Sequence, residues 1–218
     1  NARMSAETYK NYLERARDKI KQHNSSDLVV LGGTSQVDTD FVDQLHALGV
    51  WYAFDDVAIH PYMNPDPPEE LQFGRENDVG AIRQMKASIQ RNGGGKGIWV
   101  TEFGYQSANG ENTNQARRTV RQAIRMRSEG IVNKLLQYTL RDDTDAVWGL
   151  TNRDFSAKES FNLWTTMIGQ LEGLEYNEPV LLADQRKIDG FGVNVAGWVV
   201  DGSHAKAKLS HSGGLDDG

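Results

Sequence analysis

The feature that most constrains this chain is an alternation of short apolar runs with longer amphipathic stretches. The apolar runs begin near residues 27, 55, 98 and 131, and each is short enough to form one strand. A continuous run of about four to eight apolar residues is typical of a strand buried on both faces, as in a parallel sheet. The stretches around them carry apolar residues at three- and four-residue steps, which predicts helices. The alternation therefore predicts βα units around a parallel sheet, an α/β fold.

The same pattern sets the expected boundaries. We predict strands over Asp27–Gly33, Val57–His60, Ile98–Phe103 and Ile131–Leu140. We predict helices over Ala6–Gln22, Asp38–Leu48, Asp78–Arg91, Thr113–Glu129 and Lys158–Ile168. In the fourth of these helices, the spacing indicates a buried face formed by Ala116, Val120, Ala123, Ile124 and Arg127.

The tail from Gly173 onward has a different pattern. Its strand-like pieces are Val180–Ala183 and Phe191–Val200, and it ends in a Gly- and Asp-rich segment. We therefore predict two parts: an α/β unit over residues 1–170, and a β-rich appendage with a flexible C-terminus over residues 171–218.

Composition excludes several classes of function. The chain has no cysteine, which rules out disulfides, thiolate metal sites and a cysteine nucleophile but leaves the compartment open. A net charge of −6 argues against binding to nucleic acid, which favours a basic face. No apolar run reaches the roughly 20 residues of a membrane-spanning helix, so no membrane partner is expected. The five histidines lack metal-ligand spacing, and we expect neither a metal nor another cofactor.

The chain starts at Asn1 rather than Met, and no signal-peptide pattern follows. We therefore expect it to be processed, trimmed or cut from something larger.

The residues that could take part in catalysis or binding lie where the predicted strands end. Glu102 is the fifth residue of the apolar run Ile98–Phe103, and burying an unpaired carboxylate costs several kcal/mol. It is therefore either a functional acid or the partner of a neighbouring Arg or Lys at the sheet edge. His60 ends the second strand and either contacts Glu102 or a ligand hydroxyl, or is a packed histidine with satisfied hydrogen bonds.

Aromatic residues occur in the loops that follow these strands. Tyr62 and Trp148 could each stack on a sugar ring or simply cover the mouth of a barrel. Trp99, inside the third strand, is expected in the core. The glycine-rich run Gly93–Gly97 precedes a strand and does not lead from a strand into a helix, so it is interpreted as a turn rather than a phosphate loop.

Several of these segments together resemble clan A glycoside hydrolases, in particular β-xylosidase/α-iduronidase-like and cellulase-like members. The segments are Ala6–Tyr9, Val29–Gly33, Val57–Tyr62 and Ile98–Gly104, with Asp145–Leu150 and Ser156–Lys158 similar to the eighth βα unit. The resemblance covers roughly Ser5 to Ile168. It implies the C-terminal half, strands five to eight, of a TIM (β/α)8 barrel with a small β-rich appendage.

The resemblance also implies roles for individual residues. Glu102 matches the nucleophile of a retaining glycosidase on strand seven, and His60 and Tyr62 match the strand-six pair that lines the sugar subsite. The substrate-binding side chains expected from this match are His60, Tyr62, Tyr105, Tyr138 and Trp148.

One part of the family pattern is missing. These enzymes carry their acid/base in an Asn-Glu pair at the end of strand four, whereas the pair Asn177-Glu178 here lies in the tail. Retaining hydrolysis requires two carboxyl groups about 5–5.5 Å apart. We therefore expect the acid/base to come from outside this chain. The missing N-terminal barrel half would be in the same polypeptide or in another chain, docked against strands five and eight.

Two functions follow from these observations. The first is a retaining O-glycoside hydrolase that degrades a polysaccharide, with an expected extracellular or secreted location. The alternative is a non-catalytic carbohydrate-binding or structural module of a larger assembly, because a fold does not guarantee its usual chemistry. A nucleotide-dependent enzyme is disfavoured because no G-x-G-x-x-G fingerprint follows a strand.

The half barrel leads to one further expectation. Without the other half, we predict that the apolar barrel-facing side chains are partly uncovered, and we assign these as Val29, Leu31, Val57, Ile59, Ile98 and Val100.

Overall fold

The computed structural model of the 218-residue chain describes residues 4–70, 76–107, 112–144, 146–172, 174–176 and 198–200. The helices are α1 (Ala6–His23), α2 (Thr39–Ala47), the short 3-10 turn η1 (Trp51–Ala53), α3 (Asp78–Arg91), α4 (Asn112–Arg127) and α5 (Glu159–Leu171). The strands are β1 (Thr34–Ser35), β2 (Val57–His60), β3 (Ile98–Phe103), β4 (Val132–Gln137), β5 (Leu174–Tyr176) and β6 (Trp198–Val200). Two of the predicted strands and the α3 helix have the expected bounds, and the other predicted helices differ by at most three residues at either end.

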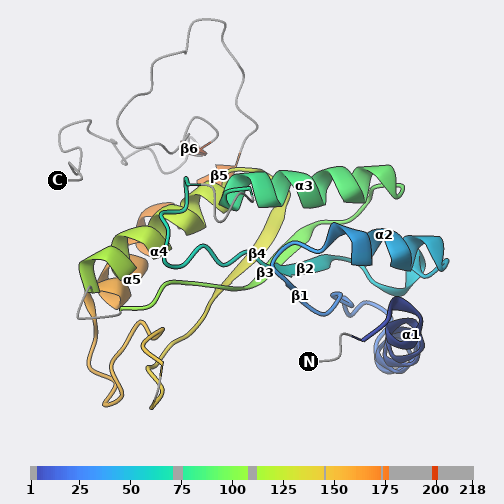
Figure 1. Cartoon of the computed structure of the whole chain (residues 1–218), viewed down its shortest axis with the longest axis horizontal. Coiled ribbons are helices and arrows are strands. Elements are labelled where there is room, and N and C mark those ends of the chain that lie inside the picture. The colour runs from blue at the N-terminus through green and yellow to red at the C-terminus, as the bar shows by residue number, and fades with distance from the viewer. Residues whose placement is uncertain are drawn as a thin grey trace, which may run out of the picture.

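The strands β1 to β4 form one parallel sheet in chain order, β1-β2-β3-β4. Val57 of β2 is in register with Ile98 of β3, and Ile98 with Val132 of β4. Helices α2, α3 and α4 lie on the same side of this sheet (Figure 1). The α/β fold with four parallel strands is thereby confirmed, and the carboxyl ends of neighbouring strands meet at one edge of the sheet.

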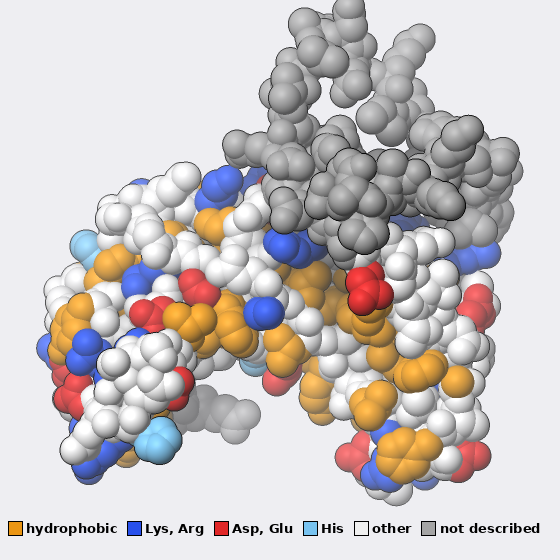
Figure 2. Space-filling model, turned by 180° about the vertical axis from the view of Figure 1, so that it is seen from behind, with side chains coloured by type: hydrophobic (Ala, Val, Ile, Leu, Met, Phe, Trp, Pro, Cys, Tyr) orange, Lys and Arg blue, Asp and Glu red, His pale blue; other side chains and the backbone are white. Residues whose placement is uncertain are grey.

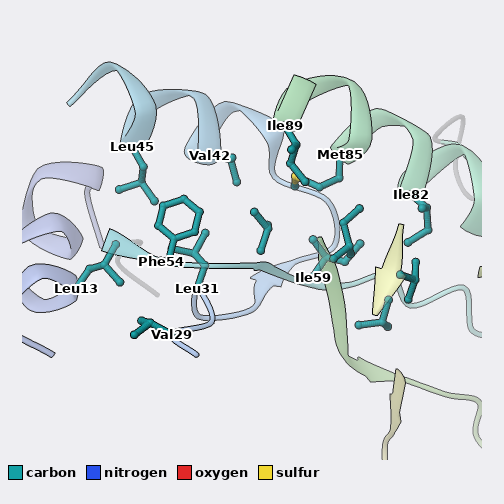
Figure 3. Packing of buried hydrophobic residues seen from close by; sticks show 14 of the residues in the cluster. Leu13, Val29, Leu31, Val42, Leu45, Phe54, Ile59, Ile82, Met85 and Ile89 are labelled. Atoms are coloured by element: carbon teal, nitrogen blue, oxygen red, sulfur yellow. The ribbon is translucent and has the colours of Figure 1, made fainter. Parts of the chain in front are cut away.

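The core lies between the sheet and the helices. Val42 and Leu45 of α2 point toward the sheet, as do Ile82, Met85 and Ile89 of α3 (Figure 3). The strand residues that meet them are fully buried: Val57, Ile59, Ile98, Val100 and Val132. Burial of each such side chain contributes about 1.5–3 kcal/mol, so this face supplies most of the stability of the sheet.

The expectation that these apolar strand residues line the open barrel interior is wrong. Val57, Ile59, Ile98 and Val100 face the helices and are completely buried. Because successive side chains of a strand point to opposite faces, the barrel-facing positions are offset by one residue. Leu135 packs against the core, so its neighbour Leu136 lies on the other face, where it is 46% exposed.

The space-filling view shows this molecule hollowed at its lower edge. The hollow lies between two lobes, and hydrophobic side chains are exposed on its wall (Figure 2). The strands β1 and β4 are the two edges of the parallel sheet.

The first strand is shorter than the sequence predicted, and it begins later in the chain. The segment before β1 does run beside β2, because the Leu31 N–H donates to the Asp56 carbonyl at 2.9 Å and Val30 forms an isolated bridge with Asp56. The next N–H along the chain, that of Gly32, donates to the Tyr9 hydroxyl at 2.8 Å. Beyond the isolated bridge at Val30, regular pairing with β2 begins only at Thr34.

The buried face of α4 also differs from the expected one. Val120, Ile124 and Arg127 are only partly buried. The buried side chains are Gln115, Ala116, Thr119, Gln122, Ala123, Arg125 and Met126. The polar members have partners that a sequence pattern does not reveal: Gln122 Nε2 donates to the Pro61 carbonyl at 2.8 Å, and Gln115 Nε2 donates to the Tyr105 carbonyl at 3.0 Å. Helix α4 thus holds the loops that follow β2 and β3.

In the tail, β5 pairs antiparallel with β6. The predicted strand over Val180–Ala183 lies outside the described residues, as does Phe191–Val200 except for its last three residues. The β-rich appendage and the boundary near residue 170 therefore stay predictions. Over the described part of the chain, we find no helix with the length and apolar character needed to cross a membrane.

Candidate active site at the strand ends

Glu102 lies near the carboxyl end of β3, where the pairing with β4 is irregular between Val100 and Phe103. Its side chain is 40% exposed, so the carboxylate is accessible rather than buried. The Tyr62 hydroxyl donates a hydrogen bond to Glu102 Oε2 at 3.0 Å, and His60 Nδ1 lies 3.6 Å from the same oxygen. These contacts, and not an ion pair with Lys or Arg, surround Glu102 in the described part of the chain.

Tyr62 follows β2 by two residues and reaches Glu102 across the strand ends. Burial raises the pKa of the Tyr62 phenol well above its usual range, and the hydrogen bond to the Glu102 carboxylate raises it further. The phenol therefore remains protonated at neutral pH and remains a hydrogen-bond donor. A donor at this position stabilises negative charge on Glu102.

His60 ends β2 and lies in the same group. Its Nε2 atom is 2.9 Å from Thr101 Oγ1, while Nδ1 is turned toward Glu102. The side chain is about one-fifth exposed. His60 thus has two polar neighbours on β3, and it is not merely packed among apolar side chains.

Three aromatic side chains stand beside the carboxylate. The Tyr62 ring is edge-on to Trp148 with centroids 5.3 Å apart and to Tyr138 at 6.5 Å. Tyr138 and Trp148 are 6.3 Å apart, also edge-on, and Tyr138 is 44% exposed. The structure therefore brings together Glu102, His60, Tyr62, Tyr138 and Trp148. Such an arrangement offers both apolar ring surface and hydroxyl groups to a ligand.

Tyr105 does not belong to this group, contrary to the sequence expectation. Its side chain is 1% exposed and cannot contact a ligand. Burial raises the pKa of the Tyr105 phenol, and the negative charge of Asp78 at the start of α3 adds to the effect. The Tyr105 side chain is thus packed beside the helices, although its backbone lies only two residues beyond β3. The position of Tyr105 in the sequence does not indicate that its side chain points toward the helices.

Trp99 is only half-buried, although the sequence suggested a core position. Its Nε1 atom donates to Asp56 Oδ2 at 2.8 Å. The same carboxylate oxygen accepts from Asn133 Nδ2 at 3.1 Å, and Asp56 Oδ1 accepts from the Gly97 N–H at 2.7 Å. Trp99 therefore takes part in a polar cluster around Asp56 that connects β2, β3 and β4.

A buried ion pair, which sequence reasoning missed, holds the loop of Trp148. Lys158 Nζ lies 2.6 Å from Asp142 Oδ2, and both residues are buried. Asp142 Oδ1 accepts from the Gly149 N–H at 2.7 Å, and Lys158 Nζ donates to Ser107 Oγ at 3.0 Å. The pair therefore fixes the residue next to Trp148 against the loop after β3. No local pattern indicates it, because the partners are far apart in the sequence.

A second buried pair joins α3 to α4. Arg125 donates to both oxygens of Asp78, with Nε at 3.1 Å from each. Burial raises the pKa of Asp78 to about 6, although Arg125 opposes the rise. Glu69, in the loop after β2, contacts Arg121 of α4 at 2.8 Å. These charges tie the loop after β2 to the helix layer.

Other candidate sites are few. In the described ranges, no group of three or more His, Asp or Glu side chains could hold a metal ion. A polar groove lies between α3 and α4, and Asn77, Arg83 and Glu129 are among its lining residues. None of the predicted site residues lines this groove.

Comparison with known proteins shows which known fold the chain shares. No protein-family model matches the sequence, and no curated protein matches it. Among solved structures, a family 39 glycoside hydrolase from Bacteroides cellulosilyticus WH2 matches with a TM-score of 0.68 and 22% identity, covering 79% of this chain and 39% of that one. The chain has the fold of part of a TIM-barrel glycosidase.

Two other solved structures agree with this assignment. A family 39 β-xylosidase from Caulobacter crescentus matches with a TM-score of 0.58 and 19% identity, over 74% of this chain and 37% of that one. A Bifidobacterium dentium β-glucuronidase matches with a TM-score of 0.53 and 14% identity, over 75% of this chain and 28% of that one. The chain therefore spans less than two-fifths of the length of each of these three structures. At these identities the matches concern the fold alone.

Proposed function

We propose that this chain is the nucleophile-bearing part of a retaining O-glycoside hydrolase that acts on a polysaccharide. The observation that carries the proposal is the accessible Glu102 carboxylate at the end of β3, hydrogen-bonded by Tyr62 and flanked by aromatic rings. The carboxyl ends of the strands are where TIM-barrel enzymes place their active sites.

The proposed chemistry follows from the properties of these groups. A Glu102 carboxylate oxygen attacks the anomeric carbon of the sugar, and the new C–O bond forms as the glycosidic C–O bond breaks. The departing oxygen takes a proton from a separate acid/base, and water later hydrolyses the glycosyl-enzyme. The Tyr62 hydroxyl orients Glu102 for the attack, since it donates to Oε2 at 3.0 Å.

The acid/base is assigned to the part of the barrel that this chain does not contain. The contacts of Glu102 in the described residues are with Tyr62 and His60, and neither is a carboxyl group. We infer that strands one to four lie in the same polypeptide or in another chain and pair with the sheet edges at β1 and β4. The exposed Leu136 on the barrel-facing side is consistent with a surface that the other barrel half would cover.

The same observations support a second candidate function. The rings of Tyr62, Tyr138 and Trp148 could bind a carbohydrate without any reaction, as part of a larger assembly. The two candidates differ in whether a second carboxyl group faces Glu102 in the complete protein. For either function, we propose that the protein acts outside the cell, where polysaccharides are encountered. Its presence in culture medium but not in washed cells would test that location.

Trapping of the covalent intermediate tests the proposed function. The complete protein that contains this chain is treated with a panel of activated 2-deoxy-2-fluoro glycosides, and its peptides are analysed by mass spectrometry. We expect the mass of one fluorosugar on the peptide that contains Glu102, and no label on the Glu102→Gln variant. A label on another carboxylate would contradict the nucleophile assignment. Glycan binding by calorimetry without any label would favour the binding module.

A further inference from the structure

The loop between β4 and α5 carries an exposed phenylalanine in an unfavourable backbone conformation. Phe155 is 61% exposed, and its φ of 65° lies in the left-handed region. That region is disfavoured for a residue with a bulky side chain, because the Cβ atom crowds the following carbonyl. An exposed ring also gains little from the hydrophobic effect. Within the described residues, neither backbone preference nor burial accounts for a phenylalanine at this position.

The hydrogen bonds of the loop show which residue the turn favours. The Phe155 N–H donates to the Asn152 carbonyl at 3.0 Å, and the Asn152 N–H donates to the Ser156 carbonyl at 2.9 Å. On either side of the turn, Thr151 and Ala157 form an antiparallel bridge. These contacts enclose a three-residue hairpin loop, a type that places a left-handed residue, usually glycine, at its end. Phenylalanine therefore stands where the turn itself favours glycine.

Polar contacts hold the rest of this loop in one shape. Arg153 Nε donates to the Asp143 carbonyl at 2.9 Å, and Arg153 Nη2 donates to the Thr144 carbonyl. The Asp154 carboxylate accepts from the Ser156 N–H at 2.9 Å and from its hydroxyl at 2.6 Å. The exposed ring is thus presented by a braced loop, and a ligand that contacts the ring has little ordering of the loop to offset.

A cationic side chain lies against the ring. The Arg141 guanidinium carbon is 4.9 Å from the centroid of the Phe155 ring, within the range of a cation–π contact, and Arg141 is itself exposed. The ring offers an apolar face, and the guanidinium offers several N–H donors. A sugar unit has the matching groups, a C–H face that stacks on aromatic rings and hydroxyl oxygens that accept hydrogen bonds.

This loop is continuous with the candidate site. It lies beyond the carboxyl end of β4 (Figure 1). The segments that follow Tyr138 and Trp148 run side by side toward it, because the Thr139 N–H donates to the Trp148 carbonyl at 3.3 Å and the Leu150 N–H to the Thr139 carbonyl at 3.0 Å. Arg141 is three residues beyond Tyr138, so their Cα atoms are at most about 11 Å apart. A chain of sugars bound at Tyr138 is therefore long enough to reach Arg141 after a few units.

From this arrangement we propose that Phe155 and Arg141 form a distal sugar-binding subsite, whose ligand is an extended chain of neutral sugars. The charge of the loop favours neutral sugars over acidic ones, because residues 141–158 contain three basic and four acidic side chains and have no positive excess. The subsite deepens the proposed function and rests on it, since it extends the surface that Tyr138 and Trp148 offer to a glycan.

Calorimetry on the complete protein that contains this chain tests the subsite. The probes are the β-1,4-linked hexasaccharides of glucose, xylose and mannose, each compared with its disaccharide, and the Glu102→Gln variant is used so that the probes are not consumed. We expect at least one hexasaccharide to bind more tightly than its disaccharide. The proposal would be overturned if the protein bound none of the hexasaccharides, or if chain length made no difference to the affinity.

Substitutions in the same background assign the gain to the two residues. Phe155→Asn should weaken hexasaccharide binding about 3- to 10-fold, the effect of one aromatic contact, and leave disaccharide binding unchanged. Phe155→Tyr keeps the ring and should keep the affinity. Arg141→Gln should lower it about 2- to 5-fold. The matched control is Tyr12→Asn, because Tyr12 of α1 is also 61% exposed but lies outside this loop. Equal affinities of Phe155→Asn and Tyr12→Asn would overturn the proposal.

Stability distinguishes a sugar subsite from packing against the other barrel half. Asparagine tolerates the left-handed region, so the urea midpoint of the complete protein should not fall in Phe155→Asn. A marked fall would show that the Phe155 ring packs against another part of the protein, and would overturn the subsite.

Turnover separates the subsite from the proposed function. Hexasaccharide binding that depends on Phe155 in a wild-type protein without turnover would contradict the hydrolase but support the subsite. A fluorosugar label on Glu102 together with hexasaccharide binding that is insensitive to Phe155→Asn would support the hydrolase and overturn the subsite.

Discussion

The two faces of the parallel sheet differ in almost every property. The helix-covered face carries Val57, Ile59, Ile98 and Val100, all fully buried, and it supplies the core. The opposite face and its carboxyl edge carry Glu102 and Tyr138, which are 40% and 44% exposed. Side chains one residue apart along a strand therefore serve different purposes. Substitutions on one face should change mainly stability, and substitutions on the other mainly chemistry.

The largest effect is expected from Glu102→Gln in the complete protein. The change is nearly isosteric but removes the charge of the proposed nucleophile, so turnover on an activated aryl glycoside should fall by several orders of magnitude. Because Glu102 is partly exposed, the urea midpoint should hardly change. Wild-type rates in this variant would show that the nucleophile has been misassigned, and a large loss of stability would break the contrast between the two faces.

On the helix-covered face, Ile59→Ala should cost about 2–5 kcal/mol of unfolding free energy, because it leaves a cavity in a closed core. The matched change on the other face is Leu136→Ala, which should cost less than about 0.5 kcal/mol in this chain alone. In the complete protein, the cost of Leu136→Ala should rise toward that of Ile59→Ala, because the other barrel half would cover Leu136. Denaturation of both variants in both contexts would measure this. Equal costs for Leu136→Ala in the two contexts would argue against barrel completion at this face.

The effect at His60 should be intermediate, because this residue contacts Glu102, the proposed nucleophile, but does not itself attack the sugar. His60→Ala should lower turnover about 10- to 1,000-fold, the effect of losing one positioned polar group, while stability falls little. Steady-state kinetics and denaturation on the same preparation would separate the two effects. If the variant unfolds instead, the packed-histidine interpretation would be favoured over the functional one.

Much of the fold could be predicted because the apolar runs have abrupt ends. Pro61 closes β2 and Gly104 closes β3, so both strands could be located from the sequence, and Glu102, His60 and Tyr62 with them. Which face each strand residue occupies could not be predicted in the same way. A run such as Val57–Ile59 is apolar at every position, so it has no alternation to show which residues meet the helices.

The remaining errors arise from contacts that are distant in sequence. The Gly32 N–H is bound by the hydroxyl of Tyr9, and the polar buried face of α4 depends on the carbonyls of Pro61 and Tyr105. The buried Asp142–Lys158 pair beside Trp148 is of the same kind. Local patterns report propensity and periodicity, and these contacts are fixed only when the loops have closed on the helices.

The smallest effect is expected at the amino end of β2, away from Glu102. Asp55 accepts from the Val29 N–H at 2.7 Å and contacts Lys21 at 3.3 Å, so it fastens the segment before β1 to the sheet. The Val29 N–H holds the pKa of Asp55 below its usual value, and Lys21 contributes. A carboxyl group whose pKa is lower in the folded state adds stability above its unfolded pKa of about 3.8, and this stability is lost as the pH falls through the folded value.

Asp55→Asn should therefore be modestly less stable than the wild type at pH 7, and the difference should shrink below pH 4. Urea denaturation at pH 7 and pH 3 would measure it, with the exposed Asp18→Asn as a control that should show little dependence. A difference that stays constant between the two pH values would mean that the carboxylate charge of Asp55 is not what fastens this segment. In that case, the contribution of this end of the sheet would come from backbone pairing alone, like the bond between Leu31 and Asp56.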